Sequence, residues 1–344
     1  MVRKKITVGL VVVVAVAAIL ITVAYVGPQL YPLTFGRPPR SVVIVVVNGL
    51  QVKAFNEYSF PIMNELKSYG VYLEGSAGQF GGDTASALVI PELITATSYS
   101  TIHSLGYNLS VEEEKYKDVI PSSVEEIFDV YHRHNYRVGV FIEYWRSTIF
   151  NAGAHSIDVF KNPQLPLWSP YRTIENMKNF DKTLVDETCT FIKENRDQNF
   201  VAFIFLSEIN EIGQISKKRA QGALSADYRD AIKNVFENLI PQIVQTLKDN
   251  RLWNNALFGI VGDYGFRDNP EYNRYTGQYK YHSEGLRDPQ CNTVIWVLAC
   301  PGGKFKQLLS GTPANFDLTA TMVQICCGEL PKQSDARVFY SLSA

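Results

Sequence analysis

The sequence predicts an α/β fold with a mainly parallel central sheet and helices on both faces, preceded by one N-terminal transmembrane helix. Short apolar runs alternate with longer helical patterns from Ser41 onward, which indicates a sheet built by crossover connections. The run 41–47 (SVVIVVV) is apolar at every position, as in a strand buried on both faces. The run 6–26 carries no charge. We expect one domain over 41–344.

The other elements follow from hydrophobic periodicity and from helix start signals. Apolar residues recurring three and four positions apart favour helices, and β-branched or aromatic runs favour strands. Ser122 and Ser123, followed by two glutamates, are typical of a capped helix start. The expected strands are 41–47, 136–142, 200–206, 256–261 and 293–299, and the expected helices are 54–68, about 122–134, 173–195, 226–250 and 316–324.

Composition excludes several classes of protein. The 344 residues include 33 Lys plus Arg and 34 Asp plus Glu, and a net charge of −1 argues against nucleic-acid binding through bulk positive charge. Hydrophobic residues make up 46%, as in globular proteins. Five cysteines are too few and too scattered for a disulfide scaffold or zinc-ribbon array, and an odd number leaves at least one free or intermolecular.

The first 40 residues divide into a basic N-terminus, 1–5, a hydrophobic run, 6–26, and a proline-rich stalk, 27–40. At about 1.5 Å per residue, a helix over 6–26 spans about 31 Å, which matches a hydrocarbon core of about 30 Å. Three basic residues at positions 3–5 precede it. The positive-inside rule then places the N-terminus in the cytosol and the domain on the extracellular or luminal side of the membrane.

Two alternatives stay open for this segment. A cleaved signal peptide usually has a shorter apolar core, of about 7–15 residues, and a mitochondrial inner-membrane anchor would carry similar flanking charges. The sequon at Asn108 is used only in a secretory lumen, so a sugar there would exclude the mitochondrial membrane. The expected partners are a lipid bilayer, through 6–26, and proteins of a membrane complex, with no nucleic acid.

Polar side chains lie next to several expected strands, where sites form in open α/β sheets. Asn, Asp and Gly are also the usual residues of turns, so each of these positions alone fits an ordinary turn better than a site. The candidates are Asn48 after 41–47, Asn210 and Gln214 after 200–206, Asp263 and Tyr264 after 256–261, His282 before 293–299, and Thr95 ahead of an expected helix.

Together, their order and spacing resemble the alkaline phosphatase superfamily, particularly its type I phosphodiesterase and nucleotide pyrophosphatase branch. Members begin with a strand ending in Asp-Gly, where this chain has SVVIVVVNGL. A Thr or Ser nucleophile that opens a helix follows, then an Asp-x-x-x-His pair, a strand ending in Asp-His-Gly and a late His. The resemblance covers nearly all of 41–340. It implies a nucleophile at position 95 and two zinc ions, one held by positions 48, 263, 264 and the nucleophile, the other by positions 210, 214 and 282.

Four of the implied zinc ligands are replaced in this chain. Thr95, Asp263 and His282 keep the family residue, whereas the replaced positions are Asn48, Asn210, Gln214 and Tyr264. Zinc favours thiolate, imidazole and carboxylate ligands, and a tyrosine, with a reference pKa of about 10, is a neutral phenol at pH 7. We therefore expect degenerate metal sites, no cofactor, and absent or feeble phosphodiester hydrolysis.

The replacement of these ligands determines the function that we expect. The chain should be a membrane-anchored, catalytically inactive phosphodiesterase-like protein that acts as a structural or interaction subunit of a membrane complex or surface assembly. The alternative is a metal-dependent phosphodiesterase or phosphotransferase with Thr95 as nucleophile. Its rearranged site would hold zinc or another divalent metal through Glu208 or Glu211, with Asp263 and His282. Thr95 at a helix start could also bind an uncleaved anion, or only cap its helix.

Overall fold

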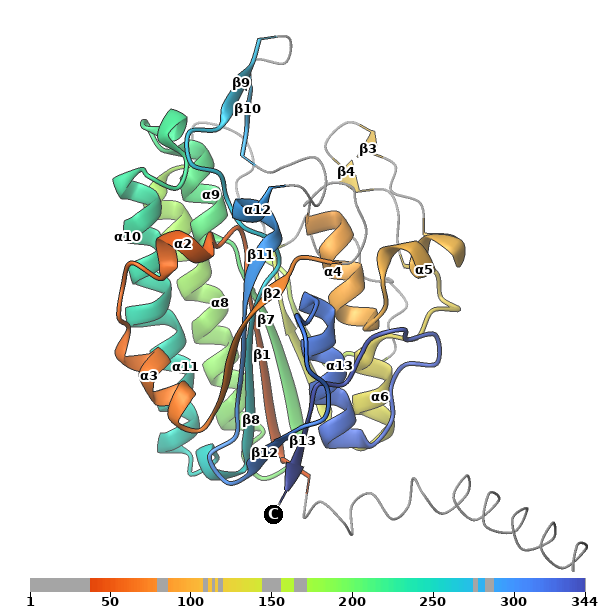
Figure 1. The fold of residues 1–344 in the computed structure, drawn as a ribbon. Coiled ribbons are helices and arrows are strands. Elements are labelled where there is room, and N and C mark those ends of the chain that lie inside the picture. The colour runs from red at the N-terminus through yellow and green to blue at the C-terminus, as the bar shows by residue number, and fades with distance from the viewer. Residues whose placement is uncertain are drawn as a thin grey trace, which may run out of the picture.

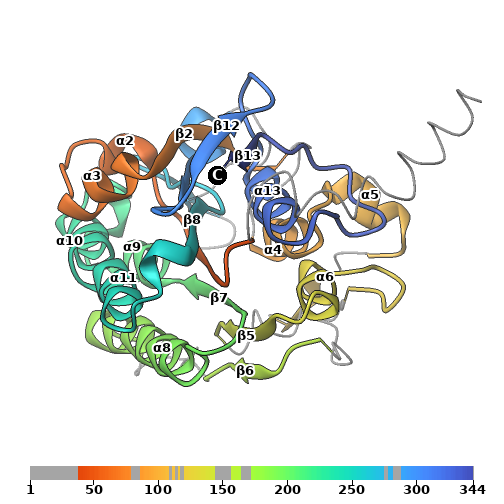
Figure 2. The ribbon, with the colours of Figure 1, turned by 90° about the horizontal axis from the view of Figure 1, so that it is seen from below.

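The computed structural model describes residues 38–78, 86–107, 111–112, 115–116, 120–143, 156–163, 172–274, 278–281 and 288–343. Its centre is a seven-stranded sheet with helices on both faces (Figures 1 and 2). In order across the sheet, the strands are β2 (Gly70–Ser76), β11 (Thr293–Ala299), β8 (Ala256–Gly262), β1 (Ser41–Val47), β7 (Phe200–Leu206), β5 (Arg137–Phe141) and β6 (Val159–Lys161). The expected fold class is confirmed.

The sheet is parallel except at β11. β1 is parallel to β7 and β8, and β5 is parallel to β6 and β7. β11 is antiparallel to both β8 and β2, so β2 runs in the same direction as β1. Val47 is in register with Leu206 and with Gly262, so β1, β7 and β8 end level with one another. We call this end of the sheet the carboxyl-terminal edge and the opposite end the amino-terminal edge.

β1 is buried on both faces, which explains its uninterrupted apolar sequence. Because side chains alternate along a strand, Val43, Val45 and Val47 belong to one apolar cluster, and Val42, Ile44 and Val46 belong to the other. The first cluster is covered by α3 (Pro61–Ser68), α8 (Ile174–Glu194), α10 (Ala226–Asn234) and α11 (Ile240–Asp249). The second is covered by α4 (Ser86–Thr95), α6 (Ile127–Arg133) and α13 (Asn315–Cys327) (Figure 2).

Two expected helices differ from the structure because of proline. The region 54–68 forms two helices, α2 (Val52–Phe55) and α3, because Phe60 is extended and Pro61 starts a new helix at its first position. The region 226–250 is a helix with a π-helical turn, Val235–Leu239, just ahead of Pro241. A proline removes one helical N–H, and a π turn is one way for the backbone to accommodate that loss.

Within the described residues, no helix combines the length and apolar character needed to cross a bilayer. The expected transmembrane run 6–26 and most of the stalk 27–40 lie outside those residues, as do the Asn108 sequon and His282. All five cysteines are described, and none forms a disulfide.

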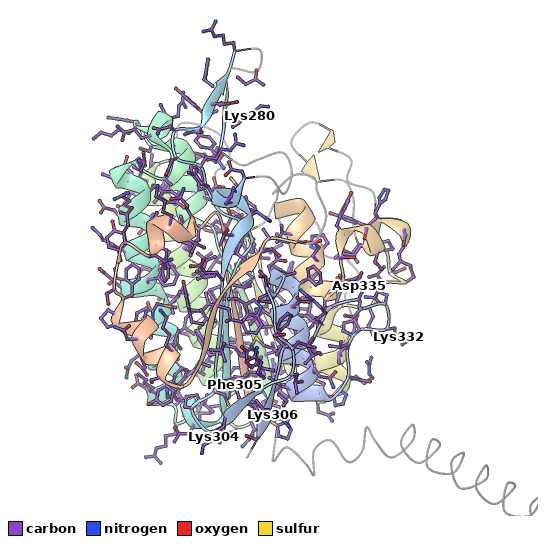
Figure 3. The ribbon with its side chains drawn as sticks, viewed as in Figure 1. Lys280, Lys304, Phe305, Lys306, Lys332 and Asp335 are labelled. Carbon is purple, nitrogen blue, oxygen red and sulfur yellow. The ribbon has the colours of Figure 1, made fainter. Side chains whose placement is uncertain are left out.

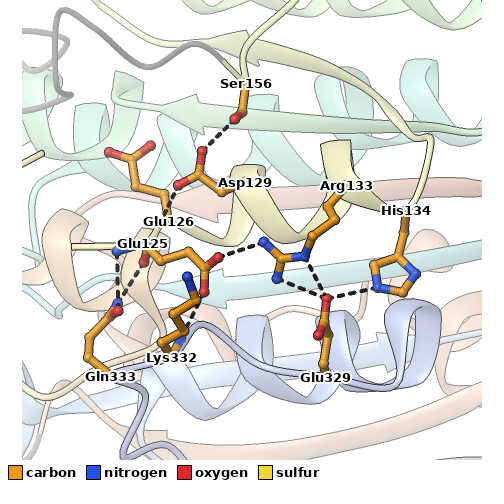
Figure 4. A network of polar contacts seen from close by, with 9 residues as sticks. All are labelled: Glu125, Glu126, Asp129, Arg133, His134, Ser156, Glu329, Lys332 and Gln333. Carbon is orange, nitrogen blue, oxygen red and sulfur yellow. Dashed lines mark hydrogen bonds and ion pairs between the residues drawn. The ribbon is translucent and has the colours of Figure 1, made fainter. Parts of the chain in front are cut away.

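A segment near the C-terminus, 329–335, lies across α6 and the turn before it; we call it the C-terminal strap (Figure 4). Glu125 holds it at two points, since its carboxylate accepts from the backbone N–H of Lys332 at 2.8 Å and its own backbone pairs with the side chain of Gln333 at 2.6 and 3.1 Å. Arg133 bridges the carboxylates of Glu125 at 2.6 Å and Glu329 at 2.8 Å. The strap is thus fixed by one nearly buried acid and one exposed acid.

Replacing these two acids separates their contributions to stability. Glu125→Ala should lower the free energy of unfolding by about 1–3 kcal/mol, because its side chain is only 11% exposed and the strap N–H and Arg133 both lose an acceptor. Glu329→Ala, which removes a 44% exposed partner of the same arginine, should cost no more than about 1 kcal/mol. Chemical denaturation of both variants tests this, and equal losses would contradict it.

Candidate functional site

Asp263 joins the loops that follow β1 and β8 at the carboxyl-terminal edge. It is fully buried, and its Oδ1 accepts from the backbone N–H of Gly49 at 2.9 Å and of Tyr264 at 2.7 Å. Its backbone carbonyl accepts from Asn315 Nδ2 at 3.2 Å, and Asn315 Oδ1 in turn accepts from the N–H of Gly78, just beyond β2, at 3.2 Å. One carboxylate and one amide therefore connect the exits of three strands.

The turn at Asn48 and Gly49 packs directly against the first turn of α9 (Glu208–Ile215). Gly49 has a φ of +69°, and a Cβ on it would lie 2.8 Å from Asn210 Cβ. Tyr228 OH donates to the Gly49 carbonyl at 2.6 Å and accepts from the N–H of Gln51 at 2.8 Å. The structure thus brings together Asn48, Asp263 and Asn210, three of the residues that the sequence selects.

Asn210 and Gln214 lie one turn apart on α9 and bond to each other. Gln214 Nε2 donates to Asn210 Oδ1 at 3.1 Å, and Asn210 Nδ2 donates to Glu211 Oε1 at 3.3 Å. Arg172 forms an ion pair with Glu211 and lies 3.5 Å from Gln214 Oε1. The spacing expected from sequence is present, but here it produces a network of amides and an ion pair.

Tyr264 points away from this network and into the core. It is only 3% exposed and belongs to the apolar cluster beneath α4 and α13. The side chain of Tyr264 therefore packs in the core, and only its backbone N–H contributes to the site, by donating to Asp263.

The sequence predicts that Thr95 opens a helix, but in the structure it is the last residue of α4. It is fully buried, and its hydroxyl donates to the Pro91 carbonyl at 2.7 Å. A threonine hydroxyl in a helix often donates to the carbonyl four residues earlier, so the Thr95 hydroxyl is used within its own helix. The expectation of a helix starting at Thr95 is wrong because a polar residue after an apolar run can mark either end of a helix.

The residue that does open α4 is Ser86. Because β2 runs parallel to β1, the chain leaves β2 at the carboxyl-terminal edge, and α4 begins on that side of the sheet (Figure 1). The sequence analysis misses this position. The signal that marks it is a serine directly before the apolar run 87–90, which is a usual helix start.

Three further carboxylates are buried at the exits of β5 and β7. Glu143 accepts from Ser207 Oγ at 2.9 Å, and Asp181 accepts from the N–H groups of Ser207 and Glu208 at 3.1 and 2.8 Å. Glu208 accepts from Asn234 Nδ2 at 2.7 Å. Burial, followed by the nearby charge of Asp181, raises the pKa of Glu208 to about 8, so this carboxyl is largely neutral at pH 7.

The described donors do not fit the zinc sites that the resemblance implies. In the part of the chain that the structure describes, no group of three or more His, Cys, Asp or Glu side chains is placed to hold a metal ion. Asp263 is held by backbone N–H groups, the amides of Asn210 and Gln214 bond to each other, and Glu211 pairs with Arg172. We derive no chemical step through a metal for this site.

Comparisons with known proteins agree on one family and one fold. The family model described as Sulfatase matches residues 40–326. Solved structures with the same fold include a 2-O GAG sulfatase (TM-score 0.60, 13% identity, covering 88% of this chain and 73% of that chain), the PsFucS1 sulfatase from Pseudoalteromonas sp. (0.59, 14%, 93% and 73%) and the lipoteichoic acid synthase LtaP from Listeria monocytogenes (0.54, 13%, 89% and 75%). No curated protein sequence matches the chain.

These findings correct the functional expectation. The superfamily is confirmed, because the sulfatase family belongs to the alkaline phosphatase superfamily. The expected inactive phosphodiesterase-like subunit is wrong, and so is the alternative of a metal-dependent phosphodiesterase with Thr95 as nucleophile, since the family model that matches residues 40–326 is Sulfatase. The finer resemblance, to the type I phosphodiesterase branch, is not shown by these comparisons.

The raised pKa of Glu208 predicts how stability depends on pH. Because the folded state binds this proton up to about pH 8 whereas the unfolded chain releases it near pH 4.5, stability should fall as pH rises from about 4.5 to 8 and then level off. The contribution of this group is on the order of 4 kcal/mol. Glu208→Gln keeps the neutral form, so its stability curve, measured by denaturation from pH 5 to 9, should be flatter by that amount.

The matched control for this prediction is Glu57→Gln, which alters a partly exposed acid paired with Arg229. It makes the same chemical change at a side chain that is 40% exposed, so its curve reports the effect of replacing a glutamate by glutamine without burial. A Glu208→Gln curve parallel to that of the parent would contradict a raised pKa.

Gly49 offers a second test of the geometry. Gly49→Ala should destabilise the protein by at least about 1 kcal/mol, because alanine is strained at a φ of +69° and its Cβ would collide with Asn210. Gly311→Ala is the control, since that glycine also has a positive φ, +114°, but open space around it. Thermal unfolding compares the two, and the second variant should show only the backbone strain.

Proposed function

Because the chain belongs to the sulfatase family, we propose that it is a sulfatase-like hydrolase that binds and cleaves an anionic ester, a sulfate ester first of all, at the carboxyl-terminal edge of its sheet. The solved sulfatases that share the fold support this class of substrate. The exits of β1, β2 and β8 are joined there by Asp263 and Asn315, which gives the edge a fixed shape.

The observation that carries the proposal is the charge state of this edge. Each of the carboxylates named above has a partner or a proton: Asp263 and Asp181 each accept from two backbone N–H groups, Glu143 accepts from the Ser207 hydroxyl, Glu211 pairs with Arg172, and Glu208 keeps its proton. An edge of this kind repels an anionic ester far less than a set of bare carboxylates would, because like charges at short range disfavour binding. It is suited to an oxyanion rather than to a free cation.

A helix start provides attraction for such an anion. α4 begins at Ser86 on this side of the sheet, and the first turn of any helix has backbone N–H groups without intrahelical partners. Arg172, whose side chain is 30% exposed, lies beside α9 at the same edge, where its charge is paired with Glu211. We assign the nucleophile position to Ser86 from its place at the start of the helix. The serine oxygen would bond to the sulfur of the bound ester, the bond from sulfur to the alcohol oxygen would break, the alcohol would leave with the serine proton, and water would then hydrolyse the serine sulfate to free sulfate and serine.

We also propose that residues 6–26 anchor the chain in a membrane, with the N-terminus cytosolic and the domain on the extracellular or luminal side. The uncharged length of this run and the basic residues before it support the proposal. The mitochondrial inner membrane is the other compartment compatible with these features, and protein partners in the membrane stay a prediction.

Turnover of 4-nitrophenyl sulfate tests the proposed hydrolase, with 4-nitrophenyl phosphate as the competing substrate. Ser86→Ala should lower kcat/KM for the sulfate by at least about a thousandfold, since removal of a nucleophile abolishes the covalent route. Thr95→Ala is the control: it should keep turnover while losing about 1–2 kcal/mol of stability, because the Pro91 carbonyl loses its donor. No sulfate turnover, or equal effects of the two substitutions, would refute the proposal.

A further inference from the structure

An exposed segment with basic and apolar side chains, 304–309 (KFKQLL), lies far from the proposed site. Its first part is β12 (Lys304–Gln307), which pairs antiparallel with β13 (Tyr340–Ser343). Lys304 and Lys306 are exposed, whereas Phe305 between them packs against the core and lies 6.2 Å from the ring of Tyr340. Leu308 and Leu309 follow with exposed fractions of 48% and 42%. Two neighbouring leucines this exposed are among the few large apolar side chains that the described surface leaves open to solvent.

This basic–leucine segment lies beside the place where the described chain begins. Both flank the loop before β8: the N–H of Arg40 donates to the Asn255 carbonyl at 3.1 Å, and Gly302 packs against the Asn254 carbonyl so closely that a Cβ would lie 1.9 Å from it. Figure 3 shows Lys304, Phe305 and Lys306 together at the amino-terminal edge, at the end of the molecule where the chain enters the fold. Residues 304–306 and the start of β1 therefore share one end of the domain, and Leu308 and Leu309 follow closely in the sequence.

Other basic residues surround the same edge. Exposed arginines stand at the start of four strands of the sheet or within five residues before it: Arg40 before β1, Arg137 in β5, Arg196 before β7 and Arg251 before β8. Exposed acids are present at the same edge, namely Asp158 before β6, Glu194 and Asp197 before β7, and Asp249 before β8. With the two lysines, however, the named bases outnumber these acids, so the edge is suited to an anionic surface.

The length of sequence before the described chain indicates which surface this is. Only 11 residues, 27–37, separate the uncharged run 6–26 from Pro38. Fully extended, they reach at most about 40 Å, so an anchor in the bilayer keeps this edge close to the lipid headgroups. We propose that 304–309 docks on that bilayer, an inference that rests on the proposed anchor. The two leucines enter the headgroup region, and Lys304 and Lys306 pair with anionic phospholipids.

Docking in this way fixes the orientation of the proposed site. β1 begins at the membrane-facing edge and runs away from it for seven residues, about 23 Å at 3.3 Å per residue. Asp263, Gly49 and the start of α4 lie at its far end. The carboxyl-terminal edge therefore faces away from the lipid, open to substrates that approach from the aqueous side.

Tryptophan quenching by brominated lipids tests the docking in the full-length chain reconstituted in vesicles. Leu309→Trp should be quenched beyond the parent protein by bromines placed high on the acyl chains. Leu224→Trp is the matched control: Leu224 is 40% exposed in a loop whose neighbour, Ala223, bonds to Arg267 beyond β8, at the opposite edge. Its quenching should equal that of the parent.

Charge reversal tests the lipid class. In vesicles with anionic phospholipid, Lys304→Glu with Lys306→Glu should reduce the docked-to-undocked ratio by about fivefold for each lysine, the factor that about 1 kcal/mol per basic residue at an anionic surface corresponds to. In purely zwitterionic vesicles the reversal should have little effect.

Three outcomes would overturn the proposal: equal quenching at positions 309 and 224, no quenching at 309, or a chain that fails to float with the vesicles. Turnover of 4-nitrophenyl sulfate, measured on the same vesicles, reports the proposed hydrolase separately, because the docking substitutions, at positions 304, 306 and 309, lie outside the carboxyl-terminal edge site.

Discussion

The geometry of the carboxyl-terminal edge depends on one buried carboxylate, Asp263. A buried charge is costly unless hydrogen bonds satisfy it, and two backbone N–H groups do so here, at 2.9 and 2.7 Å. Because one of the two belongs to Gly49, the loop after β1 cannot move without leaving the charge of the β8 loop unsatisfied. The level ends of β1, β7 and β8 make this short bridge possible.

The neighbouring polar groups follow the same rule of local compensation. Asn210 and Gln214 satisfy each other, Arg172 neutralises Glu211, and Glu208 keeps its proton. Amides at these positions relieve the repulsion that carboxylates there would add, while the hydrogen bonds keep α9 against the Asn48–Gly49 turn. The edge thus gains a fixed, weakly charged surface, which agrees better with binding an anionic ester than with holding zinc through this set of residues.

Elements that are buried on one or both faces are predictable from the sequence. Positions whose role depends on a hydrogen-bond partner elsewhere in the fold are not. The strands 41–47, 200–206 and 293–299 are confirmed to the residue, because continuous apolar runs have no other stable place than the sheet interior. The analysis misses β2, whose sequence GVYLEGS is mostly half-buried at the sheet edge. Thr95 is also misplaced, at the start of a helix, because only the packed structure shows that its hydroxyl donates to the Pro91 carbonyl within α4. The positions of Asn48, Asn210, Gln214 and Asp263 at strand exits are predictable from topology, whereas their hydrogen-bond partners and the branch of the superfamily are not.

Sheet polarity connects the two proposals on function and on docking. In a parallel sheet, the strands that bring polar loops together at one edge necessarily begin at the other, so a chain that enters from a membrane at β1 carries its site at the distal edge. An anchor attached directly after β7 or β8 would instead hold the carboxyl-terminal edge toward the membrane, because those strands are parallel to β1 and end level with it. In the proposed arrangement, the position of the first strand at the centre of the sheet, directly behind the expected stalk, determines which way the site faces, and the exposed bases around the amino-terminal edge would stabilise that orientation.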